Sequence, residues 1–259
     1  MKLTILTENI AGTDFQAEPG ISYLIEIDGE KILFDTGPSN VYLNNAQKMG
    51  INIHEDVKIV VLSHGHLDHG NGLEHIEGKT LICHPSCFIK RYRKADYGYI
   101  GLSLTKKEIQ NKFNLIETIK PFQITEHLLF LGEIPRLNDF EAQSTTFVDE
   151  YGNEDYVPDD SALVASIKNE LILITGCSHS GICNITEYAK KVTGISKVKV
   201  VLGGFHLKQA NHQTIQTAKY FKHQKGVNVF PSHCTKPEAI SALELKQFRQ
   251  VKTGMVFQF

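Results

Sequence analysis

The first half of the chain consists of short apolar runs separated by turn residues, a pattern that predicts closely spaced β-strands. The expected strands cover residues 2–7, 21–27, 31–34, 57–62 and 80–83. Asp28-Gly29 is a strong hairpin signal between the second and third of these strands. Apolar residues from Val41 to Met49 are instead spaced for one face of a helix, which we expect to end at Gly50. His84-Pro85 is expected to open a further helix.

The second half alternates strands and helices. We expect strands at residues 162–167, 171–175, 197–202 and 227–230. Expected helices cover residues 184–192 and 210–222, and another begins at Pro237. Early strands followed by strand–helix units predict an α/β fold, a mixed sheet with helices on its outer face. No linker interrupts the pattern, so we expect a single domain over residues 1–259, with a polar, tyrosine-rich insertion or lid near 89–120.

Composition narrows the class of protein. Hydrophobic residues make up 41% and charged residues 22% of the chain, as in ordinary soluble globular proteins. The net charge of −2 gives no basic field for nucleic acid or anionic lipid, and no apolar run is long enough to cross a membrane. The sequence shows no signal peptide, and its five cysteines form no CxxC pair, which favours free thiols in a cytoplasmic protein. We therefore expect a small-molecule partner, and the sequence leaves homo-oligomer formation open.

The strongest chemical signal is the segment Ser63-His64-Gly65-His66-Leu67-Asp68-His69, which directly follows the expected strand at 57–62. Neutral imidazoles and a carboxylate are good ligands for zinc, iron or manganese. Alternate residues of a tight loop can project to the same side, so His64 and His66 can reach one ion. Asp68 and His69 can then reach a second ion. The segment therefore predicts a site for one or two divalent metal ions.

A metal site also needs ligands from elsewhere in the chain, and three histidines have a suitable context. His179, His206 and His233 each follow an apolar strand and a break that contains glycine or proline. Sites in α/β folds gather at the carboxyl ends of strands, which favours these three. Cys177 stands two residues before His179, and Cys234 directly follows His233. Whether the two cysteines are packing residues or thiolate ligands stays open.

The order of motifs resembles the metallo-β-lactamase superfamily. The loop from His64 to His69 matches its HxHxDH hallmark, and Phe34-Asp35-Thr36-Gly37 resembles its first motif. The resemblance implies a four-layer αββα sandwich, in which each half of the chain supplies one sheet and Asp35 braces the metal loop. A narrower resemblance points to the branch that includes the dihydropterin-linking synthase of methanopterin biosynthesis. The segments that carry it are Glu18 to Ser22, Leu131 to Arg136, Asp159 to Leu163, Gly176 to His179, Gly203 to Leu207 and Ser232 to Thr235.

By this resemblance, the predicted ligands divide into two sets. They are His64, His66 and His179 for one metal, and Asp68, His69 and His233 for the other. The chain departs from the superfamily at two places. The HxxGH-type third motif is absent, with Asp160 standing near its position, and the bridging aspartate is missing, with Cys177 nearby. Without a bridging carboxylate, we expect either a weak second metal or a bridge made by water alone.

The expected activity is metal-assisted hydrolysis, or a phosphoryl-type displacement, on a small phosphorylated or ester-containing anion. Zinc is the first expectation for the cofactor, with iron, manganese and magnesium as alternatives. Asp68 is the expected proton acceptor, and His206 is expected either to contact a substrate phosphate, to act as general acid, or to be structural. A pterin-linked synthase is one specific form of this reaction. The alternative from another class is a non-catalytic metal- or ligand-binding module that keeps the fold.

Overall fold

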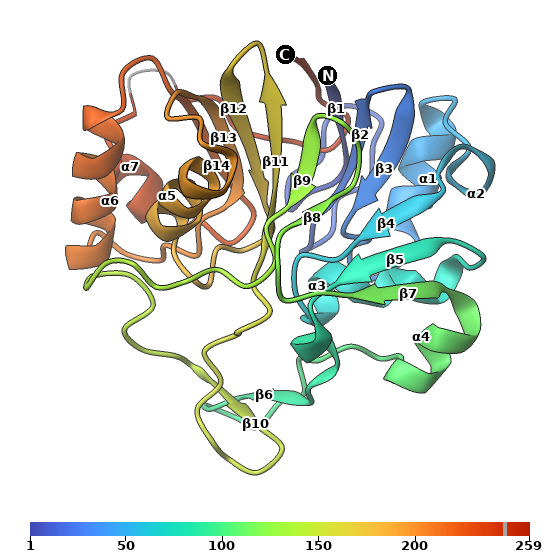
Figure 1. Cartoon of the computed structure of the whole chain (residues 1–259). Helices are drawn as coiled ribbons and strands as arrows, with labels where there is room; N and C mark the ends of the chain where they lie inside the picture. Colours follow the sequence, from blue (N-terminus) through green and yellow to red (C-terminus); the bar gives the residue numbers. More distant parts are fainter. Residues whose placement is uncertain (246–247) are drawn as a thin grey trace. The chain divides into compact units, whose positions relative to one another are not determined.

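Two large sheets, each with its own helices, carry most of the regular structure in residues 1–245 and 248–259, the part of the chain that the computed structural model describes (Figure 1). They belong to two compact units. Unit 1 comprises Met1–Ile119, Thr146–Asp155 and Val251–Phe259, and unit 2 comprises Lys120–Thr145 and Tyr156–Gln250. No helix in the described residues combines the length and the apolar character that a bilayer span requires.

The sheet of unit 1 has the strand order β15-β1-β2-β3-β4-β5-β7. Its strands are β1 (Lys2–Thr7), β2 (Ser22–Ile27), β3 (Glu30–Phe34), β4 (Ile59–Val61), β5 (Thr80–Cys83), β7 (Asn114–Glu117) and β15 (Val256–Gln258). The strands from β15 to β3 pair antiparallel, whereas β3, β4, β5 and β7 pair parallel. Because β3 and β4 run in the same direction, the loops that follow Phe34 and Val61 leave the same edge of the sheet.

Helices of unit 1 supply apolar residues to a core on this sheet. They are α1 (Val41–Lys48), α2 (Ile53–Asp56), α3 (Leu67–Gly70) and α4 (Lys106–Lys112), with 3₁₀ turns at Asn71–His75 and Pro85–Phe88. Tyr42 and Ala46 of α1 pack with Leu24 and Leu33 of the sheet in one buried cluster. A small separate sheet pairs β6 (Arg91–Arg93) with β10 (Phe147–Asp149).

The sheet of unit 2 has the order β14-β13-β12-β11-β9-β8. Its strands are β8 (Phe122–Gln123), β9 (Leu128–Phe130), β11 (Ala162–Ile167), β12 (Glu170–Thr175), β13 (Val198–Gly204) and β14 (Asn228–Ser232). The helices are α5 (Ile182–Thr193), α6 (His212–His223) and α7 (Pro237–Ala242), and α5 packs on β11 and β12. Because β12, β13 and β14 pair parallel, their carboxyl ends meet at one edge.

The α/β class and the metallo-β-lactamase fold predicted from the sequence are confirmed. Each half of the chain supplies most of one large sheet, but the C-terminal strand β15 pairs with β1 in the sheet of unit 1. Three details differ from the expectations. β4 is shorter than residues 57–62, because the backbone N–H of Val57 donates to the carbonyl of Ile53 and closes α2. His84-Pro85 opens only a 3₁₀ turn, since the chain becomes extended at Ile89. Residues 106–117 of the expected insertion form α4 and the edge strand β7 of the sheet.

The remaining domain predictions stay predictions: that the two units behave as one domain, and that the segment near 89–120 acts as a lid.

Candidate metal centre

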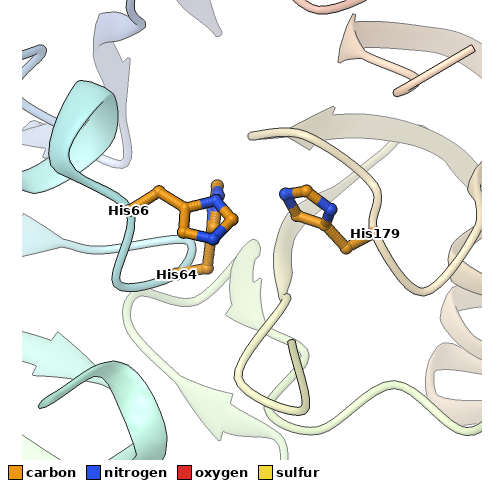
Figure 2. Close-up of side chains that lie close together, drawn as sticks. All are labelled: His64, His66 and His179. Atoms are coloured by element: carbon orange, nitrogen blue, oxygen red, sulfur yellow. The ribbon is translucent and has the colours of Figure 1, made fainter. Parts of the chain in front are cut away.

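The loop after β4 gathers the ligand candidates of unit 1. The side chains of His64, His66 and His69 are all buried. His64 Nε2 lies 3.0 Å from His66 Nδ1, and the rings of His64 and His69 have centroids 4.2 Å apart. Asp68 Oδ2 lies 4.0 Å from His69 Nε2. His66 directly precedes α3, so the start of this helix fixes where Asp68 and His69 project. Figure 2 shows the side chains of His64 and His66 on this loop.

Asp35, at the end of the neighbouring parallel strand β3, holds this loop in place. The backbone N–H of Ser63 donates to Asp35 Oδ1 and the Ser63 hydroxyl donates to Oδ2, both at 2.7 Å. His69 Nδ1 lies 2.7 Å from the same Oδ2. An imidazole whose Nδ1–H donates to a carboxylate presents Nε2 as its metal-ligating atom. Asp35 thereby sets the tautomer of His69, and it does so from a left-handed backbone conformation (φ +57°) that asparagine and aspartate tolerate best.

Two residues outside the HxHxDH motif, Cys87 and Phe147, shape the loop. A Cβ on Gly65 would lie 1.9 Å from the carbonyl oxygen of Cys87, so only glycine fits there. The ring of Phe147 packs edge-on against His66, with centroids 4.9 Å apart. Phe147 lies far from the motif in sequence and has no recognisable signal of its own.

In unit 2 the chemistry-bearing residues come from three loops at the shared edge of β12, β13 and β14. Cys177 and His179 follow β12, His206 follows β13, and His233 and Cys234 follow β14. Ser178, His206 and His233 have φ values of +57°, +49° and +49°. Such conformations cost free energy in non-glycine residues, and they are found most often where the backbone must aim a functional side chain.

These loops place their side chains against one another. The rings of His179 and His206 have centroids 4.2 Å apart. One ligand atom each from Cys177, His206 and Cys234 lies within 4.8 Å of the other two. Burial by itself would raise the pKa of the Cys234 thiol, but hydrogen bonds with Cys177 and His206 and the charges of His233 and His206 lower it well below its usual value. His179, labelled in Figure 2, extends from the loop after β12.

Asp160 of unit 2 contacts the loop that carries His179 and is not part of the cysteine–histidine cluster. One of its carboxylate oxygens accepts hydrogen bonds from the backbone N–H and the hydroxyl of Ser180, on the same loop as His179. Among the described residues the other oxygen, Oδ1, has no hydrogen-bond partner. Burial raises the pKa of Asp160 to about 6. Asp160 therefore anchors the loop that carries a predicted ligand.

Comparison with known proteins identifies the family. A family model described as the metallo-beta-lactamase superfamily matches residues 17–179, which cover the whole HxHxDH loop and Asp160 and end at His179. The chain belongs to the metallo-β-lactamase superfamily. The resemblance seen in the sequence is thus confirmed.

Relatives within the metallo-β-lactamase superfamily match over the full length of the chain. An uncharacterised protein of Methanocaldococcus jannaschii is 38% identical, covering 98% of both chains. The 7,8-dihydropterin-6-methyl-4-(β-D-ribofuranosyl)-aminobenzene-5′-phosphate synthase of the same organism is 30% identical, covering 100% of this chain and 97% of the synthase. The crystal structure of Tm1679, described as a metal-dependent hydrolase of the β-lactamase superfamily, matches with a TM-score of 0.88 and 29% identity, covering 100% of this chain and 99% of Tm1679.

Most of the predicted site residues thus form a local cluster in each unit of this metallo-β-lactamase superfamily member. Unit 1 brings together Asp35, His64, His66, Asp68 and His69, and unit 2 brings together Cys177, His179, His206 and Cys234. The histidines without a strand-end context lie elsewhere: His54, His75, His127, His212 and His223 are exposed, and His84 Nδ1 accepts from the backbone N–H of Ser86. The Ser63 hydroxyl was not assigned a role from the sequence, although its adjacency to the motif was a usable signal.

Proposed function

We propose that this chain is a metal-dependent hydrolase that acts on a small phosphorylated or ester-containing anion. The observation that supports it best is the loop after β4, where three buried imidazoles and a carboxylate converge and Asp35 sets the tautomer of one of them. Buried groups that can carry charge are normally hydrogen-bonded, paired or bound to a metal, and one metal ion would compensate for the burial of several imidazoles together. Imidazole and carboxylate together suit zinc and, less selectively, iron or manganese.

The proposed ligand set follows the family resemblance. It contains His64, His66, Asp68 and His69 of unit 1, with His179 and His233 of unit 2. When bound, divalent ions of this kind lower the pKa of a coordinated water and polarise an ester or phosphoryl oxygen. The sequence lacks the aspartate that would bridge two ions in this superfamily, so metal content is itself informative. The number of ions lost when His64 and His66 are removed would say whether this ligand set holds one ion or two.

Asp68 has the position that a proton acceptor needs. Its side chain is 31% exposed, whereas those of Asp35 and His69 are fully buried. Of the loop's carboxylate and imidazoles, Asp68 is therefore the group with the most access to solvent. We propose that it takes the proton of the attacking water and passes it to bulk solvent.

His206 has two alternative roles. A ring beside His179 can contact a substrate phosphate or donate a proton to a leaving group, and a ring beside two thiols can be a metal ligand. His206→Ala separates them. Loss of turnover with unchanged metal content supports the substrate role, and loss of metal supports the ligand role.

The substrate class rests on the relatives. The synthase from M. jannaschii is named for a phosphorylated ribofuranosyl product, so phosphorylated pterin derivatives belong in the first activity screen, with phosphodiesters and lactones beside them. We propose the phosphorylated class over neutral esters on this ground.

The testing experiment measures metal and turnover together. The protein is purified without added metal or chelator, and elemental analysis is performed beside the His64→Ala, His66→Ala double variant. His54→Ala, His75→Ala is the matched control, because it removes two exposed histidines of the same unit. We expect zinc, iron or manganese in the parent and the control, and a lower metal content without turnover in the first variant.

No metal in the parent, even after reconstitution, would contradict the enzyme proposal. Bound metal without turnover on any of the three substrate classes would instead favour the second candidate, a binding module that keeps the fold.

A further inference from the structure

The two cysteines at the edge of β12 and β14 are brought together by the sheet, although 57 residues separate them in sequence. The parallel register pairs Thr175 with Gly203 and Gly204 with Ser232. Continued by two residues past the strand ends, this register sets Cys234 level with His206 and sets Cys177 one residue before that level. The parallel strands thus bring the three residues to within one residue of the same level at the edge.

Gly204 provides the space in which the sulfur atoms meet. A Cβ at this position would lie 2.6 Å from Cys234 Sγ and 3.3 Å from Cys177 Cα. It would also lie 2.5 Å from the carbonyl oxygen of Gly176, so any larger residue would displace Cys234 or the backbone just before Cys177. The glycine sits in the strand between those that carry them, so it keeps the middle of the edge open.

Hydrogen bonds orient the sulfur of Cys234. The backbone N–H of His206 donates to Cys234 Sγ at 3.2 Å, and Cys234 Sγ donates to the carbonyl oxygen of Cys177 at 3.6 Å. The loops themselves are fastened by a bond at 2.9 Å from the backbone N–H of Phe205 to the Thr235 hydroxyl. The cluster is thus a built arrangement of buried and half-buried groups on rigid strand ends.

We propose that Cys177, Cys234 and His206 form a thiolate site for a divalent ion of the zinc type, held by unit 2 alone. Their ligand atoms lie within 4.8 Å of one another. Zinc–sulfur bonds of about 2.3 Å in a tetrahedral site put two sulfur ligands about 3.8 Å apart, so closure around an ion takes a side-chain shift of roughly 1 Å. Two cysteines and one histidine leave the fourth position open, as in zinc sites that bind water or a small ligand. Binding releases to solvent any thiol proton that the two cysteines still carry.

This site goes beyond the proposed hydrolase function, because it needs none of the ligands on the loop after β4. It assigns His206 the ligand role of the two considered above. It also gives Cys177 a role that the packing interpretation does not, since packing alone would not require a second sulfur beside it.

Cys183 provides a matched control within the same unit. It is as buried as Cys177, but it lies in α5 and belongs to none of the candidate metal groups among the described residues. Substitution of Cys183 therefore shows what the loss of a buried thiol does when that thiol is not a proposed metal ligand.

The experiment is a cobalt titration of the full chain, stripped of metal and kept reduced and free of oxygen. Cobalt bound to thiolates gives a sulfur-to-metal charge-transfer band that histidine and carboxylate ligands do not give. We expect the band in the parent, in Cys183→Ser, and in His64→Ala, His66→Ala, with saturation at one thiolate-bound ion per chain. The band should disappear in Cys177→Ser, Cys234→Ser and weaken at least severalfold in His206→Ala.

Circular dichroism of each variant confirms that it is folded before the comparison is made. Absence of the band in the folded parent, or its persistence without both cysteines, would overturn the proposal. Loss of the band in folded His64→Ala, His66→Ala would also overturn it, because the cysteines would then act only together with the histidine loop. Hydrolysis, and the metal that is lost in His64→Ala, His66→Ala, report on the loop after β4, whereas the cobalt–thiolate band reports on the cysteines. Failure of one proposal is therefore distinguishable from failure of the other.

Discussion

The ligand candidates of unit 1 and unit 2 are built in opposite ways. In unit 1, His64, His66, Asp68 and His69 come from one loop that follows one strand, and Asp35 holds that loop from the next strand. In unit 2, Cys177, His206 and Cys234 come from three strand ends and meet only because β12, β13 and β14 run parallel. The first cluster is encoded locally, and the second is encoded by topology.

The difference has an energetic consequence. A loop held by one buried carboxylate depends on that carboxylate for its whole geometry, so a single substitution should disable it. A cluster spread over three strands is supported by sheet pairing and by several weaker contacts between loops. Its geometry should therefore respond gradually to single changes, unless the change fills the space at its centre.

Asp35→Ala is expected to have the largest effect, on both the free energy of unfolding and the affinity for metal. It leaves the backbone N–H and hydroxyl of Ser63 and the imidazole of His69 without their buried carboxylate. Removing one member of such a buried network costs about 3–5 kcal/mol, and loss of an outer partner of a metal-ligating histidine weakens metal binding about 10–100-fold. Chemical denaturation and zinc competition measure the two quantities. Asp56→Ala, which breaks a surface pair with Lys31, is the control and should change little. A stable, metal-replete Asp35→Ala would refute the dependence on one carboxylate.

Gly204→Ala and Gly65→Ala together test whether filling the space beside one cluster disables that cluster and leaves the other intact. An added Cβ would meet Cys234 Sγ at 2.6 Å in the first variant and the Cys87 carbonyl at 1.9 Å in the second. Overpacking of this kind costs about 1–3 kcal/mol, occasionally more. We expect Gly204→Ala to lose the cobalt–thiolate band and to retain metal on the loop after β4, and Gly65→Ala to show the reverse. If both variants lost both properties, the two clusters would not be separable.

Asp160→Asn tests the pH dependence that burial imposes on unit 2. The folded state raises the pKa of Asp160 from 3.8 to about 6. As pH rises through this window, the unfolded chain releases the proton first, so the free energy of unfolding falls between about pH 4 and 6. At about 1.4 kcal/mol for each pKa unit, the loss is on the order of 3 kcal/mol in the metal-free protein. Asp160→Asn should remove this slope while its side-chain oxygen still accepts from Ser180. Denaturation across this pH range with an unchanged slope would contradict the assignment.

The same contrast decides how much could be predicted from the sequence. Apolar periodicity located β1, β2, β3, α5 and β13 because each is a contiguous pattern, and the HxHxDH loop was recognisable for the same reason. The expected insertion near 89–120 was harder, because β7 is only half buried at the sheet edge and lacks a strong apolar run. The packing of Phe147 on His66, and the meeting of Cys177 with Cys234, depend on tertiary pairing that local pattern does not contain.

Thr235→Val is expected to have the smallest effect, and it tests the gradual response of unit 2 most directly. The Thr235 hydroxyl accepts from the backbone N–H of Phe205 and so ties the loop after β14 to the loop after β13. Valine keeps the shape and leaves that buried N–H without its acceptor, at a cost of about 1–2 kcal/mol. Cobalt binding should weaken severalfold with the charge-transfer band retained, because sheet pairing still brings the cysteines together. Thr235→Ser keeps the hydroxyl and should bind cobalt as the parent does. Complete loss of the band in a folded Thr235→Val would show that one side-chain hydrogen bond, and not the parallel strands, determines the geometry of the cluster.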